Sequence, residues 1–208
     1  MSNLLHHRPP ASTLRVGAQV AIPREREGFD LPAMARRMWR PALGMGLMAI
    51  AAGIIAGAVQ ASASNPLHVQ QIGAWNPGLL FLGIGFLLSA VTFVLGTILG
   101  ELRDGGAKVQ TALGEKVLIL KRPWTGYTFP AAMMMGLMTL LAAFAIGFVQ
   151  AAKLDNDPAG AADIGAWVTP LRFAGVALIF TGVALALATI VRALRFQGDR
   201  VSQIAAGR

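Results

Sequence analysis

The chain has 208 residues, of which 55% are hydrophobic and only 13% are charged. A soluble domain carries about a quarter charged residues, so the composition indicates that lipid surrounds much of the chain. The sequence has no cysteine, which excludes disulfides, thiolate metal sites, cysteine nucleophiles and iron–sulfur clusters.

The N-terminal segment, residues 1–29, is polar, contains prolines and lacks hydrophobic periodicity. We expect it to be a solvated or partner-bound tail. From Asp30, a suitable N-cap with Pro32 in the first turn, the sequence predicts a short helix. Its separate apolar and arginine-rich faces favour a position along the inner membrane surface, with Trp39 at the depth of the lipid headgroups.

Four apolar stretches are long enough to cross a bilayer, which takes roughly 20 residues of helix. They are residues 41–61, 78–100, 130–151 and 173–191, and none contains a charged side chain. The sequence therefore predicts an all-α membrane protein with four transmembrane helices. Arg36 and Arg37 before the first stretch could belong to a cleaved twin-arginine signal. However, a signal peptide totals roughly 15–30 residues, so we expect an uncleaved helix.

Basic residues are distributed unevenly around these spans. All 18 except Lys153 and Arg172 fall in the N-terminal tail, in the loop after the second span or in the C-terminal tail. The positive-inside rule then places both termini and the middle loop in the cytoplasm, with residues 62–77 and 152–172 outside. The net charge of +8 is explained by this topology and by anionic lipid headgroups, without a nucleic-acid partner. The abundance of arginine, alanine and glycine indicates a GC-rich bacterial genome, and we expect the protein in the bacterial inner membrane.

The two halves of the chain resemble each other. The matches include Ile72-Gly73-Ala74-Trp75 with Ile164-Gly165-Ala166-Trp167, Gly46-Leu47-Met48 with Gly136-Leu137-Met138, and Gln60 with Gln150. The offset is 90 residues in the first span of each half and 92 residues thereafter. Ordered matches of this kind predict a tandem duplication of a two-helix hairpin.

The duplication defines the expected organisation. The repeats are residues 30–106 and 130–198, joined by a linker over 107–129 and followed by a tail over 199–208. Because both copies enter from the cytoplasm, we expect parallel repeats related by a pseudo-twofold axis along the membrane normal.

The paired residues have two interpretations. Trp75 and Trp167 are expected as interfacial anchors, and Gln60 and Gln150 as donors of interhelical hydrogen bonds. The alternative is a paired polar site beneath the outer loops. Two GxxxG pairs, Gly53–Gly57 and Gly96–Gly100, predict close helix packing, either within this chain or with a partner.

The chemistry expected of an enzyme is missing. The spans contain no Asp, Glu, His, Lys or Arg, which argues against proton relays and against haem ligation within the membrane. Arg172, at the edge of the fourth span, is expected to extend to the headgroups. Hydroxyl groups in the spans have no base to activate them. We expect neither catalysis nor a cofactor.

Methionines gather near the cytoplasmic ends of the first and third spans. Thioethers are suitable ligands for Cu(I), and the candidate ligands are Met45, Met48, Met134 and Met138. Methionine is also an adaptable packing and protein-binding residue, and no Cys or His accompanies the cluster. We therefore expect packing or partner contact, with copper handling as an alternative.

Three functions remain open. The leading hypothesis is a non-catalytic accessory subunit that binds other integral membrane proteins. The second is a component of a small-solute channel or transporter, and the third is copper handling. A pore should place Thr and Gln side chains on one continuous internal face, whereas a scaffold should expose glycine and aromatic ridges.

Overall fold

Four long helices dominate the computed structural model, which describes residues 21–22, 31–114, 117–120 and 123–206. They are α2 (Leu31–Ser62), α3 (Pro66–Ala112), α4 (Thr125–Lys153) and α5 (Pro158–Ala206). All four are long and apolar enough to cross a membrane. The predicted all-helical architecture with four spans is confirmed to this extent. Of the predicted tail, only the two-residue strand β1 (Ala21–Ile22) belongs to the described residues.

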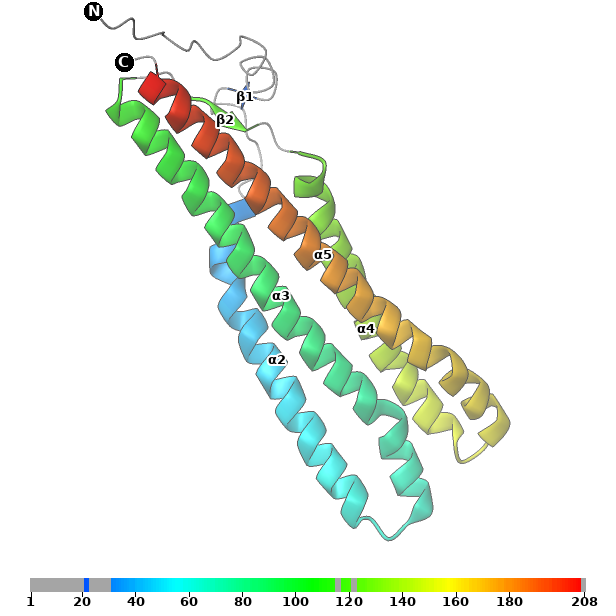
Figure 1. Ribbon diagram of the computed structural model, residues 1–208. Coiled ribbons are helices and arrows are strands. Elements are labelled where there is room, and N and C mark those ends of the chain that lie inside the picture. The colour runs from blue at the N-terminus through cyan, green and yellow to red at the C-terminus, as the bar shows by residue number, and fades with distance from the viewer. Residues whose placement is uncertain (1–20, 23–30, 115–116, 121–122, 207–208) are drawn as a thin grey trace, which may run out of the picture.

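The helices form two hairpins side by side, with both turns at one end (Figure 1). The turns are short because a side chain caps the helix that follows each of them. Asn65 Oδ1 accepts a hydrogen bond from the Leu67 N–H at 3.0 Å, and Asp157 Oδ1 accepts one from the Gly160 N–H at 2.9 Å. As a result α3 and α5 begin well before their apolar stretches, and most of the predicted loops 62–77 and 152–172 are helical.

The start of α2 differs from the prediction. Residues 31–40 do not form a separate helix but continue through Pro41 into the span as one helix of 32 residues. A proline removes one backbone donor, and contacts with α3 hold this part of α2 in place. Ala35 and Ala42 are buried, and Arg36 Nη1 lies 3.3 Å from Glu101 Oε1 on α3.

The helices α3 and α5 are longer than a membrane requires. They contain 47 and 49 residues, which corresponds to about 70 Å at 1.5 Å per residue, against a hydrocarbon core of about 30 Å. Their C-terminal parts extend beyond the starts of α2 and α4 (Figure 1). Near this end of the bundle α3 and α5 pack on each other: Leu99 contacts Ile190 and Ala193, and Gln197 Nε2 donates to the Leu102 carbonyl at 3.5 Å.

A short segment folds back on this extension. Gln110, only 2% exposed, donates to the Leu118 carbonyl at 3.0 Å and accepts from the Leu118 N–H at 2.9 Å. The next residues form strand β2 (Ile119–Leu120), which pairs antiparallel with β1.

Within each hairpin the helices cross at a pair of glycines. A Cβ on Gly46 would lie 3.0 Å from the Gly83 carbonyl oxygen, and a Cβ on Gly136 would lie 2.7 Å from the Gly175 carbonyl oxygen. Because these are backbone contacts, a side chain at Gly136 could be accommodated only by moving the helices apart.

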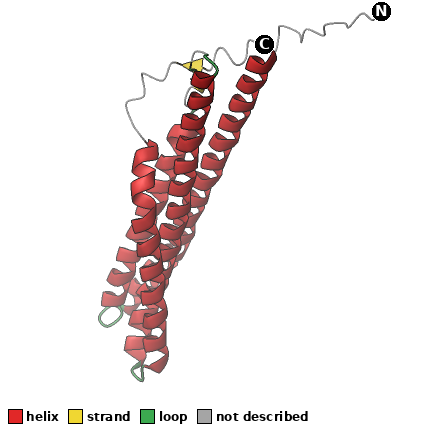
Figure 2. Cartoon of the chain, turned by 90° about the vertical axis from the view of Figure 1, so that its left-hand side faces the viewer, coloured by secondary structure: helices red, strands yellow, loops and turns green. Residues whose placement is uncertain are grey.

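The two hairpins meet asymmetrically in an elongated, nearly parallel bundle (Figure 2). Helix α3 packs against both α4 and α5, whereas α2 packs extensively only along α3. A pseudo-twofold axis would give α2 a contact with α5 equivalent to that between α3 and α4. The expected twofold arrangement is therefore wrong. The cause lies on α3, where Gly78 and Gly85 admit side chains of α4 into close contact.

Candidate functional site

Arg172 is the most unusual side chain of the bundle. It lies on α5 and is only 6% exposed, and its Nη2 donates to the Ala74 carbonyl on α3 at 2.9 Å. Its Nε is buried and has no hydrogen-bond partner among the residues that the structure describes. The expectation that Arg172 extends to the headgroups is therefore wrong, since its guanidinium group turns inward between the hairpins.

Two glycines make room for this guanidinium group. A Cβ on Gly78 of α3 or on Gly147 of α4 would lie 3.3 Å from Arg172 Nη2. The Cβ on Gly147 would also lie 3.0 Å from the Ala74 carbonyl oxygen. Three helices thus converge on one cation, which links the second hairpin to the first.

Aromatic rings pack beside this junction. Trp75 of α3 stacks on Phe148 of α4 with ring centroids 5.4 Å apart, and Phe144 meets Phe148 edge-on at 4.9 Å. Trp75 therefore packs between the hairpins, whereas Trp167, the other predicted anchor, is 79% exposed. The two tryptophans of the repeated motif occupy different environments.

Asn76 is a second buried polar residue, on the side of α3 that faces α2. Its Oδ1 is buried, and no described residue forms a hydrogen bond with it. A Cβ on Gly53 would lie 3.4 Å from this oxygen, and a Cβ on Gly57 would lie 3.5 Å from Asn76 Nδ2. The side chain fits against the glycine face of α2.

The junction has the chemistry of a structural contact. Within the described ranges no carboxylate forms a salt bridge with Arg172, and a guanidinium group remains protonated in proteins, so it cannot act as a base. Buried hydroxyls further along α3 donate to carbonyls of their own helix: Ser89 to Gly85 at 2.8 Å and Thr92 to Leu88 at 3.0 Å. The arrangement can position helices, and none of these groups supplies a nucleophile–base pair.

The predicted glutamines lie at the two hairpin turns. Gln60 Nε2 donates to the Val69 carbonyl of α3 at 3.1 Å, which is an interhelical hydrogen bond. Gln150 lies against Gly165, where a Cβ would be 2.6 Å from its Nε2. Each glutamine thus contacts the opposite helix of its own hairpin, and the structure does not bring the two together.

The predicted glycine faces are internal. Gly53 is buried against Leu80 of α3, and Gly57 lies beside Asn76. Gly96 and Gly100 on α3 are also buried. At Gly53–Gly57 the neighbour is α3 of the same chain, which corresponds to packing within the chain, and a contact of these faces with a partner stays a prediction.

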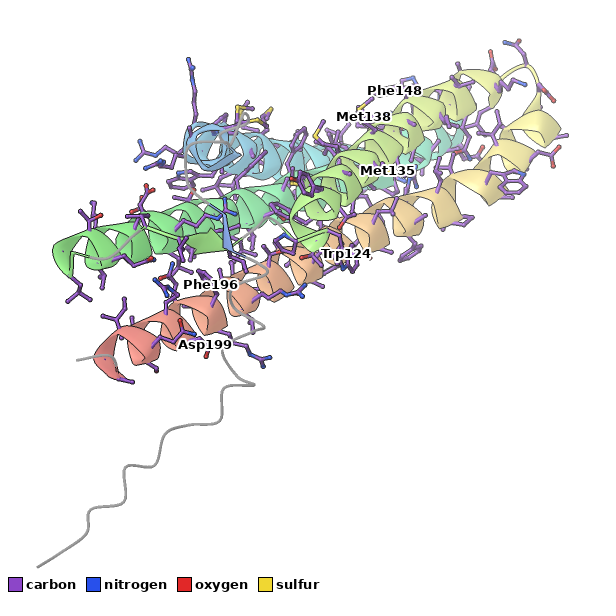
Figure 3. The ribbon with its side chains drawn as sticks, turned by 90° about the horizontal axis from the view of Figure 1, so that it is seen from above. Trp124, Met135, Met138, Phe148, Phe196 and Asp199 are labelled. Atoms are coloured by element: carbon purple, nitrogen blue, oxygen red, sulfur yellow. The ribbon has the colours of Figure 1, made fainter. Side chains whose placement is uncertain are left out.

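The methionines lie mostly on outward faces. Met45 and Met48 are exposed on α2, and Met134 and Met138 on α4. Met135 and Met138 project from α4 in Figure 3. Since α2 and α4 do not pack extensively together, the two pairs form no joint site. Nor does the described part of the chain contain a group of three or more His, Cys, Asp or Glu residues that could hold a metal ion.

Sequence reasoning missed the burial of Arg172 and Asn76. A signal was present in the spacing, because Val168, Arg172, Gly175 and Ile179 follow one another by three or four residues and share one face of α5. All four are buried. The periodicity of the apolar residues, rather than the distance from the end of the span, would have predicted the inward orientation.

Compared with known protein families, curated proteins and solved structures, the chain shows no match.

Proposed function

We propose that the protein is a non-catalytic accessory subunit of a bacterial inner-membrane complex, which binds other integral membrane proteins through its helix faces. The observation that carries this proposal is the solid apolar core between the hairpins. Leu82, Leu140 and Ile179 fill it, surrounded by the partly buried side chains of Phe81, Phe86, Leu88, Leu137, Phe144 and Val176. A core of this kind holds helices together and offers no path to a solute.

The hydroxyl groups support the same proposal. Ser89 and Thr92 are buried, whereas Thr181 is exposed on α5, and each donates to its own helix. They do not form one continuous internal face, as a pore within the chain would require. A small-solute channel, the alternative function, would have to lie between chains.

The exposed surface offers extensive area for partner helices. Among the described elements, helix α2 packs extensively only with α3, and its outward side chains include Leu47, Met48, Ile54, Ile55 and Val59. Among the exposed aromatic residues are Trp124, Tyr127, Phe148, Trp167, Phe173 and Phe180. In a membrane such faces meet lipid or the helices of other subunits, where close packing drives association.

The proposal includes the tandem duplication and the orientation with both termini in the cytoplasm. The duplication is supported by the equivalent crossings of Gly46 with Gly83 and of Gly136 with Gly175. The orientation is supported by the basic residues at the end of the molecule opposite the hairpin turns. Those residues would contact anionic headgroups at the cytoplasmic surface.

Mild-detergent purification followed by native mass measurement tests the proposed function. We expect an assembly of fixed composition that is larger than one chain, and no selective solute flux when the purified chain is placed in liposomes. A chain that stays monomeric without partners and conducts a solute selectively would refute the proposal in favour of the transporter.

The orientation can be tested separately by cysteine labelling. Because the sequence has no native cysteine, only the introduced residue can react. Ser64→Cys and Asn156→Cys, both at exposed turn positions, should react with an impermeant thiol reagent applied to intact cells. Thr111→Cys should not react until the cells are opened. Thr111 is exposed whereas its neighbour Gln110 is buried, so a lack of labelling at Thr111 would report topology and not burial. The reverse pattern would overturn the orientation.

A further inference from the structure

The two hairpins use one face of the repeat in different ways. On α3 the face turned toward the second hairpin is buried and includes Ala74, Gly78, Leu82, Gly85, Ser89 and Thr92. The positions 92 residues later lie on α5 and are Ala166, Pro170, Ala174, Ala177, Thr181 and Ala184. All six are exposed. We call these residues the free face of α5.

The surface that receives α3 also has an uncovered equivalent. On α4 it includes Leu137, Leu140 and Phe144, and the positions 90 residues earlier on α2 are Leu47, Ile50 and Ile54. Ile50 packs inside its own hairpin against Gly83, whereas Leu47 is 56% and Ile54 64% exposed. Ile84 of α3, which is equivalent to Val176, is also exposed. We call Leu47, Ile54 and Ile84 the receiving face.

The chemistry of the two free surfaces matches that of the internal interface. Inside the chain, Gly85 lies directly against Leu140 and Ile179, so a small residue on one helix admits large aliphatic side chains from the other hairpin. The free face of α5 is likewise composed mainly of alanine, and the receiving face of leucine and isoleucine. Small residues allow helix backbones to approach closely in membranes.

We propose that the free face of α5 binds the receiving face of a second copy of this chain, which repeats the contact between the two hairpins. The inference rests on the proposed duplication and names the chain itself as a partner. The contact is head-to-tail, because each copy contributes a different surface to it and keeps one of each kind free. Such contacts continue until a ring closes, or extend as an open array. The parallel orientation of all copies is the one that a membrane permits.

The internal interface supplies a cross-link that tests this arrangement. A Cβ on Gly78 would lie 3.2 Å from the Cα of Phe144, so the two helices approach closely at these positions, and cysteines at the corresponding positions of a repeated contact would be within cross-linking reach of each other. The equivalent positions are Pro170 on α5 and Ile54 on α2. These two helices do not pack extensively together within one chain, so a disulfide between them reports a contact between copies.

The experiment uses the full chain in its native membrane. Ile54→Cys and Pro170→Cys are carried on separately tagged copies, expressed together and oxidised. We expect a covalent dimer that contains both tags, and a ladder of larger species when one chain carries both cysteines. Ala142→Cys is the matched control, since Ala142 is exposed on the side of α4 opposite Leu140, and with Pro170→Cys it should give no such dimer.

A second pair of variants keeps the test independent of cysteine chemistry. Ala177→Trp should reduce the number of copies in the assembly purified in mild detergent, whereas Ala142→Trp should leave it unchanged. The absence of the Ile54–Pro170 dimer, or equal cross-linking at Ala142, would overturn the inference. If the chain then still purified in a fixed complex with other proteins, the proposed function would stand. A chain that bound neither itself nor another protein would refute both.

Discussion

The first and second hairpins contain matching sequences but bury them differently. At equivalent positions, a Cβ on Gly147 of α4 would lie 3.0 Å from the Ala74 carbonyl oxygen and 3.1 Å from the Cα of Trp75. A Cβ on Gly57 of α2 would meet nothing nearer than Asn76 Nδ2 at 3.5 Å, an ordinary van der Waals distance. The same residue type is thus required by close backbone approach in one hairpin and not in the other.

The difference shows that the neighbouring hairpin, rather than the repeated sequence, determines the role of each position. Leu80 of α3 packs on Gly53 inside the first hairpin, whereas Arg172, the equivalent residue of α5, donates across to the Ala74 carbonyl of the other hairpin. After the proposed duplication, the two copies would have diverged where one receives a neighbour that the other lacks. The polar junction is therefore a product of the interface.

The equivalent glycines Gly147 and Gly57 provide the strongest test of this difference between the hairpins. We expect Gly147→Ala to lower the free energy of unfolding by about 1–3 kcal/mol, because the new methyl group would force backbone atoms of α3 and α4 apart. Gly57→Ala should raise it by about 0.5–1 kcal/mol, since alanine is the better helix former and space is available. Reversible unfolding in detergent, followed by circular dichroism, measures both. Equal effects at the two positions would show that the hairpins are packed alike.

The equivalent tryptophans Trp75 and Trp167 provide a second test of the difference between the hairpins, with a smaller expected effect on stability. Trp75→Ala should cost about 2 kcal/mol, because it removes the stacking on Phe148 together with buried apolar area. Trp167→Ala should change stability by no more than about 0.5 kcal/mol in the isolated chain, since Trp167 is exposed. The same detergent unfolding experiment compares the two variants. A larger loss at Trp167 than at Trp75 would contradict the assignment of Trp75 to the internal interface.

Features that depend on local sequence were predictable, and those that depend on the contact between hairpins were not. The four spans follow from the length of each apolar run, which is a property of one segment. The continuity of α2 through Pro41 was missed because contacts with α3, such as the ion pair of Arg36 with Glu101, stabilise its first turns. The helix starts near Asn65 and Asp157 were missed because hydropathy reports lipid contact and not capping.

The candidate site shows the same limit. The interhelical bond of Gln60 joins residues only nine positions apart, and its type was anticipated from the residue alone. The periodicity of α5 indicates that Arg172 points inward, but the glycines that make room for it, at positions 78 and 147, lie on two other helices, and no local pattern indicates that those helices converge there. The asymmetric packing of α3 against both α4 and α5 was likewise unpredictable, because the repeated sequence does not indicate which helices of the two hairpins contact each other.

The smallest expected difference concerns the two turns, whose capping residues differ in charge. Asp157 accepts the Gly160 N–H, and Lys153 Nζ lies 3.5 Å from its other oxygen. The Gly160 hydrogen bond holds the pKa of Asp157 below its ordinary value of 3.8; desolvation opposes this effect, and Lys153 adds to it. Because the folded pKa is the lower one, this stabilisation is fully present above the unfolded pKa and is lost as the pH falls through the folded pKa. Asn65, the cap of the first turn, does not titrate in this range.

Hydrogen exchange measured from pH 5 down to pH 3, corrected for intrinsic rates, should therefore show protection falling at Gly160 and Ala161 but not at Leu67 and Val69. Asp157→Asn should abolish the pH dependence, and an equal fall at both turns would show that the local carboxylate is not its cause.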